Sequence, residues 1–325
     1  MVKNKNNNTT VLLAGASGYI GAHVKNILVD DGYKVLPVFR KSNSTNAIIS
    51  KDCLQVDFLN ALSVSSFFNN CPDINVIISC IGSRRGGKID SWQAEFSANK
   101  ILLELGLKKK AHQFILLSAI CVQKPMLEFQ YAKLAFEKEL IRSNMTYSIV
   151  RPTAFFKSLS GQLDRIKKGK SFIIFDSGEN TWCKPISEND TARYLVDCIR
   201  IKARKNKILP IGGSTSPISS KTIGRIIFRL TGKKPRFKSV PSVVFKLADK
   251  ALSPLSFFSP KIRDFREFLR IANYYATQSM LCWNEKLQRY DSTITPEFGK
   301  DTLEEHLKKM IKTKAPSETG HHKLF

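Results

Sequence analysis

The sequence predicts an α/β fold in which a doubly wound parallel sheet is followed by a smaller C-terminal region. Short apolar runs alternate with amphipathic helical patterns through the first half of the chain. This alternation is typical of a parallel sheet covered by helices on both faces. The apolar runs are nearly continuous, as expected of strands that are buried on both sides. A glycine-rich segment, GASGYIG (15–21), separates the first strand from the first helix.

The first 152 residues hold the regular part of the pattern. Apolar runs with β-branched residues predict strands, and longer amphipathic segments between them predict helices. The expected strands are 10–15, 33–39, 53–58, 75–83, 113–120 and 147–152. The expected helices are 19–31, 63–70, 91–110 and 128–143.

Beyond residue 152 the alternation loosens, which divides the chain into an NAD(P)-binding domain (1–152) and a substrate-binding region (153–325) partly interleaved with the sheet. Ser187, three residues before Asp190, predicts the N-cap of a helix. The further elements expected here are a strand, a turn and a second extended piece in 171–187, a helix at 190–205, a strand at 207–213, a helix near 218–231 and an amphipathic stretch at 302–312.

The chain of 325 residues carries a formal net charge of +25, and the excess is uneven. Residues 160–240 hold 18 Lys and Arg against 6 Asp and Glu. The basic residues occur as pairs without a nucleic-acid-binding motif, so we expect no nucleic-acid partner. A solvated basic face, an anionic membrane surface and an acidic substrate remain open as explanations.

The seven cysteines predict a reducing compartment. Their number is odd, their spacing is wide and no CxxC motif occurs, which argues against disulfides, zinc and iron–sulfur clusters. No apolar run approaches the ~18–20 residues that span a bilayer, and no signal peptide is visible at the start. We therefore expect a protein that works in the compartment where it is made, or one shown in its processed form.

The glycine-rich segment predicts a Rossmann-type dinucleotide site. Glycines after a strand allow a tight turn and a close approach to phosphate, while the N–H groups at the helix start bind the pyrophosphate. A tight turn without a ligand is the alternative. The residues expected to contact the cofactor here are Gly15, Ser17, Gly18, Tyr19, Ile20 and Gly21.

The end of the second strand predicts the choice of cofactor. NAD-binding proteins usually carry an acidic residue at this point, whereas this chain has Arg40 and Lys41. Arg40 can hold the 2′-phosphate of NADPH in a forked contact, although both cations could simply be solvated. Asp57 and Phe58 end the third strand, where the adenine would lie, and Asp57 could equally cap a turn.

Other strand ends supply the remaining candidates at the cofactor. Cys80, Ile81 and Gly82 lie at the glycine-containing end of the fourth strand, Pro152 ends the sixth, and Thr153 follows it. Ser118 ends the fifth strand, where it could polarise a substrate or serve only as a local backbone partner.

Longer stretches of the sequence resemble a known family. The glycine pattern and Lys133 resemble the short-chain dehydrogenase/reductase superfamily in its NmrA-like branch. Nearly the whole chain resembles the NADPH-dependent 8-vinyl reductases of chlorophyll synthesis. The stretches that carry this second resemblance are LLSAICVQKPMLEFQYAKLAFE (116–137), YSIVRPTAFFKSLSGQ (147–162), CKPISENDTAR (183–193), LPIGG (209–213), YYATQSMLCW (274–283) and GHHKLF (320–325).

The resemblance implies a tetrapyrrole substrate, a 3,8-divinyl (proto)chlorophyllide, and a reaction consistent with Phe129. Many carbonyl reductases have a proton-donating tyrosine four residues before the lysine, where this chain has Phe129. Reduction of a vinyl group spreads charge over the macrocycle and forms no alkoxide, so it does not need that phenol. Lys133 would orient the nicotinamide ribose and favour the developing anion. Tyr131, where the family commonly has a basic residue, is the fallback acid.

The macrocycle requires an apolar slot beyond the sixth strand. We expect Phe155, Phe156 and Trp182 there, although the two phenylalanines could be ordinary core residues. Arg84, Arg85 or Lys157 would meet the propionate.

The resemblance also implies a place in the cell and leaves alternatives. A greasy, anionic pigment implies a soluble or peripheral protein on the cytoplasmic or stromal side of the photosynthetic membrane, touching the thylakoid surface. A noncatalytic NADP(H)-binding assembly or regulatory factor of that membrane is one alternative function. A reductase or epimerase of the same branch with another substrate is a second alternative.

Overall fold

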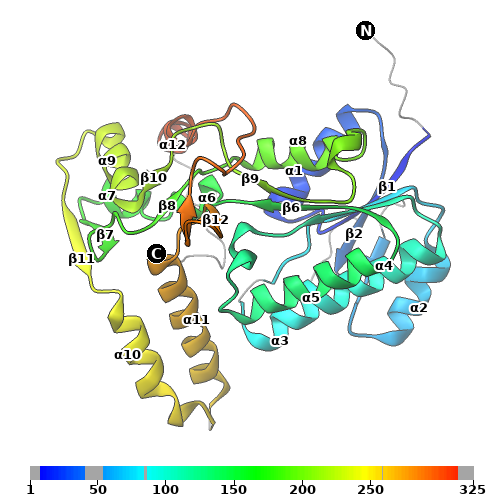
Figure 1. Cartoon of the computed structure of the whole chain (residues 1–325), viewed down its shortest axis with the longest axis horizontal. Coiled ribbons are helices and arrows are strands. Elements are labelled where there is room, and N and C mark those ends of the chain that lie inside the picture. Colours follow the sequence, from blue (N-terminus) through cyan, green and yellow to red (C-terminus); the bar gives the residue numbers. More distant parts are fainter. Residues whose placement is uncertain (1–7, 41–53, 84–85, 258, 314–325) are drawn as a thin grey trace.

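A seven-stranded sheet forms the centre of the molecule (Figure 1). The computed structural model describes residues 8–40, 54–83, 86–257 and 259–313, with the Arg40 side chain excluded. The strand order is β3-β2-β1-β4-β5-β6-β9, and all neighbouring pairs are parallel, which confirms the predicted sheet. The strands are β1 (Thr10–Ala14), β2 (Lys34–Arg40), β3 (Leu54–Val56), β4 (Val76–Ser79), β5 (Gln113–Leu117), β6 (Thr146–Pro152) and β9 (Lys207–Ile211).

Helices cover both faces of this sheet (Figure 1). Side chains alternate along β1, so Val11 and Leu13 join one buried cluster while Leu12 and Ala14 join the other. The first cluster lies under α1 (Tyr19–Asp30) and α8 (Glu188–Asp197). The second lies under α2 (Ala61–Asn70), α4 (Ala98–Lys108) and α5 (Glu128–Arg142).

The helix predicted at 91–110 is longer at its start and irregular. It begins as α3 (Lys88–Ser91), continues through a π-helical segment (Trp92–Ser97) and becomes α4. Such π segments occur mostly as single turns and frequently lie at functional sites. The predicted helix at 190–205 was too long, because α8 ends at Asp197. Its predicted N-cap is confirmed, since the Ser187 side chain accepts from the Asp190 amide at 2.9 Å.

The region after β6 forms a second core but returns to the main sheet. β9 pairs with β6, and α8 packs on α1, so the two regions are interleaved. The boundary at residue 152 stays a prediction. The second core lies among α6 (Phe156–Leu159), α7 (Leu163–Lys167), α9 (Ser220–Thr231), α12 (Leu303–Lys312) and the strand pairs β7 (Phe172–Phe175) with β11 (Phe237–Val240) and β8 (Trp182–Cys183) with β10 (Ile218–Ser219).

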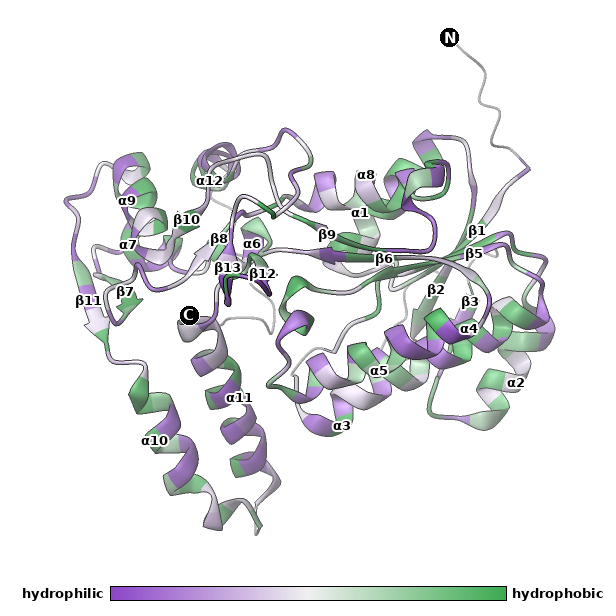
Figure 2. Cartoon of the chain, viewed as in Figure 1, coloured by the Kyte–Doolittle hydropathy of each residue, from purple (hydrophilic) through white to green (hydrophobic). Residues whose placement is uncertain are grey.

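A helical hairpin extends away from the second core (Figure 1). It consists of α10 (Val243–Leu252), a 3-10 turn (Pro254–Phe257) and α11 (Pro260–Thr277), and α11 leads into the hairpin β12 (Cys282–Asn284) and β13 (Arg289–Asp291). Figure 2 shows hydrophobic and hydrophilic residues mixed along both helices. No residue of α10 is buried, so one of its apolar faces is open to solvent. Within the described ranges, no helix is both long and apolar enough to cross a bilayer.

Candidate active site

The turn between β1 and α1 requires glycine at two positions. Gly15 has φ +79°, and a Cβ there would lie 2.7 Å from the Cys80 carbonyl oxygen. A Cβ on Gly21 would lie 2.0 Å from the Gly15 carbonyl oxygen. Gly18 is the N-cap of α1 and, like Ser17, is exposed. This compact turn leaves the start of α1 open to an anion, as a pyrophosphate requires.

The two residues that follow Gly18 point in different directions. Ile20 is buried under the sheet and supports the turn from inside. The Tyr19 hydroxyl donates to Glu188 Oε2 at 2.5 Å, and its ring packs edge-on against Phe155 at 6.3 Å. Lys157 Nζ lies 4.8 Å from the centre of the Tyr19 ring. Tyr19 therefore connects the glycine turn to the end of β6.

The residues expected at the adenosine lie at the ends of β2 and β3, toward one edge of the sheet. Arg40 is the last residue of β2 and pairs in register with Val56, while its side chain and the whole of Lys41 lie outside the described residues. Asp57 Oδ1 accepts from the Leu59 amide at 3.0 Å, which is the turn-capping role. Phe58 packs edge-on against Phe67.

The ends of β4 and β6 approach the glycine turn. The Cys80 amide donates to the Ala14 carbonyl, and burial raises the pKa of the Cys80 thiol to about 12 although Lys133 lowers it. Ile81 packs on the second cluster and Gly82 is exposed. Beyond the buried Pro152, the Thr153 hydroxyl donates to the Lys184 carbonyl, so that side chain is engaged with backbone.

Lys133 forms a buried ion pair that the sequence did not predict. Its Nζ lies 2.7 Å from Glu95 Oε2, and the two side chains are 12% and 4% exposed. The other oxygen of Glu95 accepts from the amide and the hydroxyl of Ser83, at 2.8 and 3.2 Å. Glu95 lies in the π-helical segment, which places its carboxylate between α5 and the segment after β4. One anion therefore holds both Lys133 and a cofactor-side loop in place.

Ser118 belongs to a separate buried network. Its hydroxyl donates to Glu137 Oε1 at 2.5 Å, and Glu137 also pairs with Arg151. Glu137 is almost fully buried, so its charge requires these partners. This placement supports a structural use of Ser118 and gives no support to its predicted role with substrate.

Tyr131 and Lys133 lie on different faces of α5, as the spacing predicted. Tyr131 is 48% exposed, and its hydroxyl donates to the Pro125 carbonyl at 3.0 Å. Phe129 lies on the inner side, packed against a buried cluster that includes Cys121 and Tyr274. Tyr131 is therefore remote from the inner side, where Phe129 stands in place of a phenol.

The three residues expected at the macrocycle have different surroundings. Phe156 is 1% exposed and packs on His306, which supports the alternative that it is an ordinary core residue. Phe155 is half-buried beside Tyr19. Trp182, in β8, is 40% exposed. Its carbonyl accepts a hydrogen bond from the amide of Met280, which follows the end of α11. Phe155 and Trp182 keep an accessible aromatic surface.

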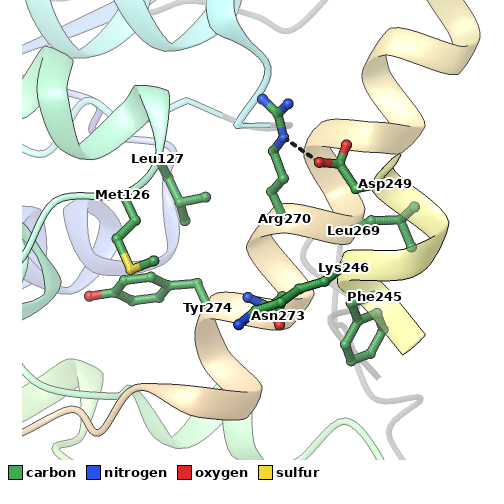
Figure 3. A pocket seen from close by; sticks show the side chains of 9 residues that line it. All are labelled: Met126, Leu127, Phe245, Lys246, Asp249, Leu269, Arg270, Asn273 and Tyr274. Atoms are coloured by element: carbon green, nitrogen blue, oxygen red, sulfur yellow. Dashed lines mark hydrogen bonds and ion pairs between the residues drawn. The ribbon is translucent and has the colours of Figure 1, made fainter. Parts of the chain in front are cut away.

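A cavity of about 180 Å³ lies between the start of α5 and the α10–α11 hairpin (Figure 3). Figure 3 shows Met126 and Leu127 on one side and Asp249, paired with Arg270, on the other. Pockets for drug-sized ligands are roughly 300–1,000 Å³. This cavity alone is therefore too small for a tetrapyrrole.

Comparisons with known proteins agree with this geometry. Residues 15–202 match a family model described as NAD(P)H-binding. The chain is 40% identical to divinyl chlorophyllide a 8-vinyl-reductase, chloroplastic, of Cucumis sativus, over 98% of this chain and 80% of that protein. It is 22% identical to photosystem II assembly factor Ycf39 of Synechocystis, over 91% and 89% of the two chains. NADPH-dependent quinone oxidoreductase QOR2 of Escherichia coli, solved with NADPH, has a TM-score of 0.68 at 14% identity, covering 93% of this chain and 99% of that one.

Proposed function

Because the chain belongs to the divinyl chlorophyllide a 8-vinyl-reductase family, we propose that it reduces the 8-vinyl group of a 3,8-divinyl (proto)chlorophyllide to ethyl, with NADPH as reductant. The observation that carries this proposal is the similarity along nearly the full length to relatives with that name. Phe129 supports it, because an alkene reductase has no alkoxide to protonate at that position.

The glycine turn supports the choice of a dinucleotide, and the end of β2 supports NADPH. Gly15 and Gly21 leave room only for hydrogen against neighbouring backbone, which lets the turn close tightly before the helix start that would bind the pyrophosphate. Arg40 and Lys41 give this end of β2 two cations and no carboxylate, which suits a 2′-phosphate. When bound, NADPH supplies a hydride to the vinyl group.

Lys133 serves the reaction by position and charge. An ammonium group has three donors, and Glu95 accepts one of them in this structure. The remaining donors suit the hydroxyls of the nicotinamide ribose. The positive charge also favours an anion that develops on the macrocycle, most strongly in a site that excludes water.

The substrate would lie beyond β6, between the glycine turn and the second core. Phe155 and Trp182 offer aromatic surface to a flat macrocycle. Of the three residues expected at the propionate, Lys157 lies within the described residues, beside the Tyr19 ring, and is the one proposed to bind it. Arg84 and Arg85, the other candidates, lie outside the described residues.

A peripheral contact with the photosynthetic membrane, on its stromal or cytoplasmic side, completes the proposal. The α10–α11 hairpin exposes large apolar side chains with lysines and arginines between them, as expected of a surface that meets anionic lipid. The exposed apolar residues are Val243, Val244, Leu247, Leu255, Phe257, Phe265 and Phe268. Co-sedimentation with vesicles of anionic lipid, which the Leu247→Glu/Phe257→Glu variant should lose, tests this contact.

The experiment that tests the reaction is direct. Purified protein is mixed with 3,8-divinyl chlorophyllide a and NADPH, and the Soret band is followed for the blue shift that accompanies loss of one conjugated vinyl group. Parallel reactions contain NADH or no reductant. Binding of NADPH without any shift would favour a noncatalytic assembly factor, the alternative that the likeness to Ycf39 raises. If the protein reduced other alkenes or ketones as fast as divinyl chlorophyllide, the result would favour a reductase that acts on another substrate.

A further inference from the structure

The second half of helix α11 approaches segments that follow the carboxyl ends of the central strands, where the chemistry of this fold takes place. Ile271 contacts the segment after β4, since a Cβ on Gly86 would lie 2.6 Å from its Cδ1. Tyr275 lies one helical turn later and therefore on the same face of α11. Both side chains pack against the cluster that also receives Ala119 after β5, and Ala154 after β6.

Tyr275 shares this cluster with Phe129, the residue at the position of the missing phenol. Phe129 approaches the cluster from α5, and Tyr275 approaches it from α11. The chain thus carries a phenol that packs against the same cluster as Phe129, but on an element more than 140 residues away in sequence.

The hydroxyl of Tyr275 differs from those of its neighbours. Tyr274 donates to the Cys121 carbonyl at 3.0 Å, and Tyr290 donates to Gln278 Oε1 at 2.8 Å. Among the described residues, no protein group forms a hydrogen bond with the Tyr275 hydroxyl. The Tyr275 residue is half-buried, and its hydroxyl, which no described residue bonds, is available to a ligand.

The surroundings of Tyr275 keep its phenol in the protonated form. Burial, and then the Cys121 thiol, raise the pKa of Tyr275, so the phenol stays protonated at physiological pH. Burial also raises the pKa of Cys121 to about 11, against the lowering effects of Gln130 and Lys133. Cys121 is a buried member of the cluster against which both Tyr275 and Phe129 pack.

We propose that Tyr275 is the catalytic acid that protonates the inner carbon of the 8-vinyl group; this inference rests on the proposed function. The C=C π bond is replaced by two C–H bonds, one formed by hydride at the terminal carbon and one by the Tyr275 proton at the inner carbon. The alkene is reduced, NADPH is oxidised to NADP⁺, and the phenolate recovers its proton from solvent.

The test compares Tyr275→Phe with wild type and with a matched control, Tyr290→Phe, which removes a neighbouring phenol hydroxyl. Steady-state kinetics with divinyl chlorophyllide, the solvent deuterium isotope effect on kcat, NADPH fluorescence titration and thermal unfolding are measured for each. Because no described residue forms a hydrogen bond with the Tyr275 hydroxyl, its removal should leave folding intact. A general acid contributes about 10²–10⁴-fold, so we expect kcat to fall by at least about 100-fold. KM and NADPH affinity should change by less than about threefold, and Tyr290→Phe should retain the wild-type kcat.

Three results would overturn the inference. The first is a Tyr275→Phe kcat within about fivefold of wild type, with an unchanged isotope effect, which would leave the proposed function standing. The second is a loss that appears in KM or NADPH affinity, because it would show a positioning role. The third is a wild-type protein that binds NADPH and pigment without turnover, which would remove the proposed function together with the acid.

Discussion

The buried Lys133–Glu95 pair predicts a large penalty when its anion is removed. In Glu95→Gln the shape is retained, but Lys133 loses its counter-ion in a place where it is only 12% exposed. Breaking a buried pair costs about 3–5 kcal/mol, and the slight exposure of Lys133 favours the lower end, about 3 kcal/mol. At about 2.1 cal/mol/K per residue, the 325 residues have an unfolding entropy near 0.7 kcal/mol/K, so the melting temperature should fall by about 4 °C.

Urea unfolding of four proteins measures this penalty: wild type, Glu95→Gln, Lys133→Met and the double variant. The double variant should recover part of the loss, because no unpaired charge remains. The matched control is Glu179→Gln, which removes an exposed partner of Lys221 and should cost less than about 1 kcal/mol. If Glu95→Gln is no less stable than Glu179→Gln, the reasoning about burial is refuted. NADPH affinity should also weaken in Glu95→Gln, since the same carboxylate holds Lys133 and the Ser83 loop.

Three further predictions concern other parts of the molecule. Gly21→Ala should weaken NADPH binding by at least about tenfold in a fluorescence titration, because its Cβ would meet the Gly15 carbonyl oxygen at 2.0 Å. The control Gly169→Ala, whose Cβ would meet no atom within 4 Å, should leave NADPH affinity unchanged. Ser118→Ala should lower the free energy of unfolding by about 1–3 kcal/mol, as expected for the loss of a hydrogen bond to a charged group. Its kcat should change by less than about fivefold. A kcat reduced about 100-fold at unchanged stability would instead support a catalytic role for Ser118. Burial lowers the pKa of His306, so below its ordinary value of about 6.5 the unfolded chain binds a proton that the folded chain does not, and the free energy of unfolding should fall as the pH decreases. Equilibrium unfolding of His306→Gln at several pH values should show a smaller dependence of this free energy on pH. An equal dependence would refute this cause.

The sheet was predictable from the sequence because strands buried on both faces must be apolar at nearly every position. Leu12 and Leu13 are both fully buried although they point to opposite faces. Right-handed crossovers limit the possible strand orders, but the observed order β3-β2-β1-β4-β5-β6-β9 was not among the predictions. The α10–α11 hairpin was not predictable in this way, because α10 buries no residue and its apolar pattern alone does not show what it packs against.

The candidate site was predictable only where chemistry is local in sequence. The turn at Gly15–Gly21 needs glycines at fixed spacing, and Lys133 stands at a fixed distance from Phe129. Glu95 and Tyr275 come from other helices, and nothing at their own positions marks them. A buried lysine does require an anion, so a counter-ion could have been expected, but its identity depends on the π-helical segment that turns Glu95 toward α5.

The return of β9 to the main sheet has a consequence for biosynthesis on the ribosome. Until Lys207–Ile211 has left the exit tunnel, β6 remains an unpaired edge, and until α8 is made, the apolar side of α1 stays uncovered. A nascent chain that ends at residue 152 therefore exposes both an open strand and a hydrophobic face. The nucleotide site cannot mature as an early, autonomous unit during translation, and chaperone contact should persist until about two thirds of the polypeptide has emerged.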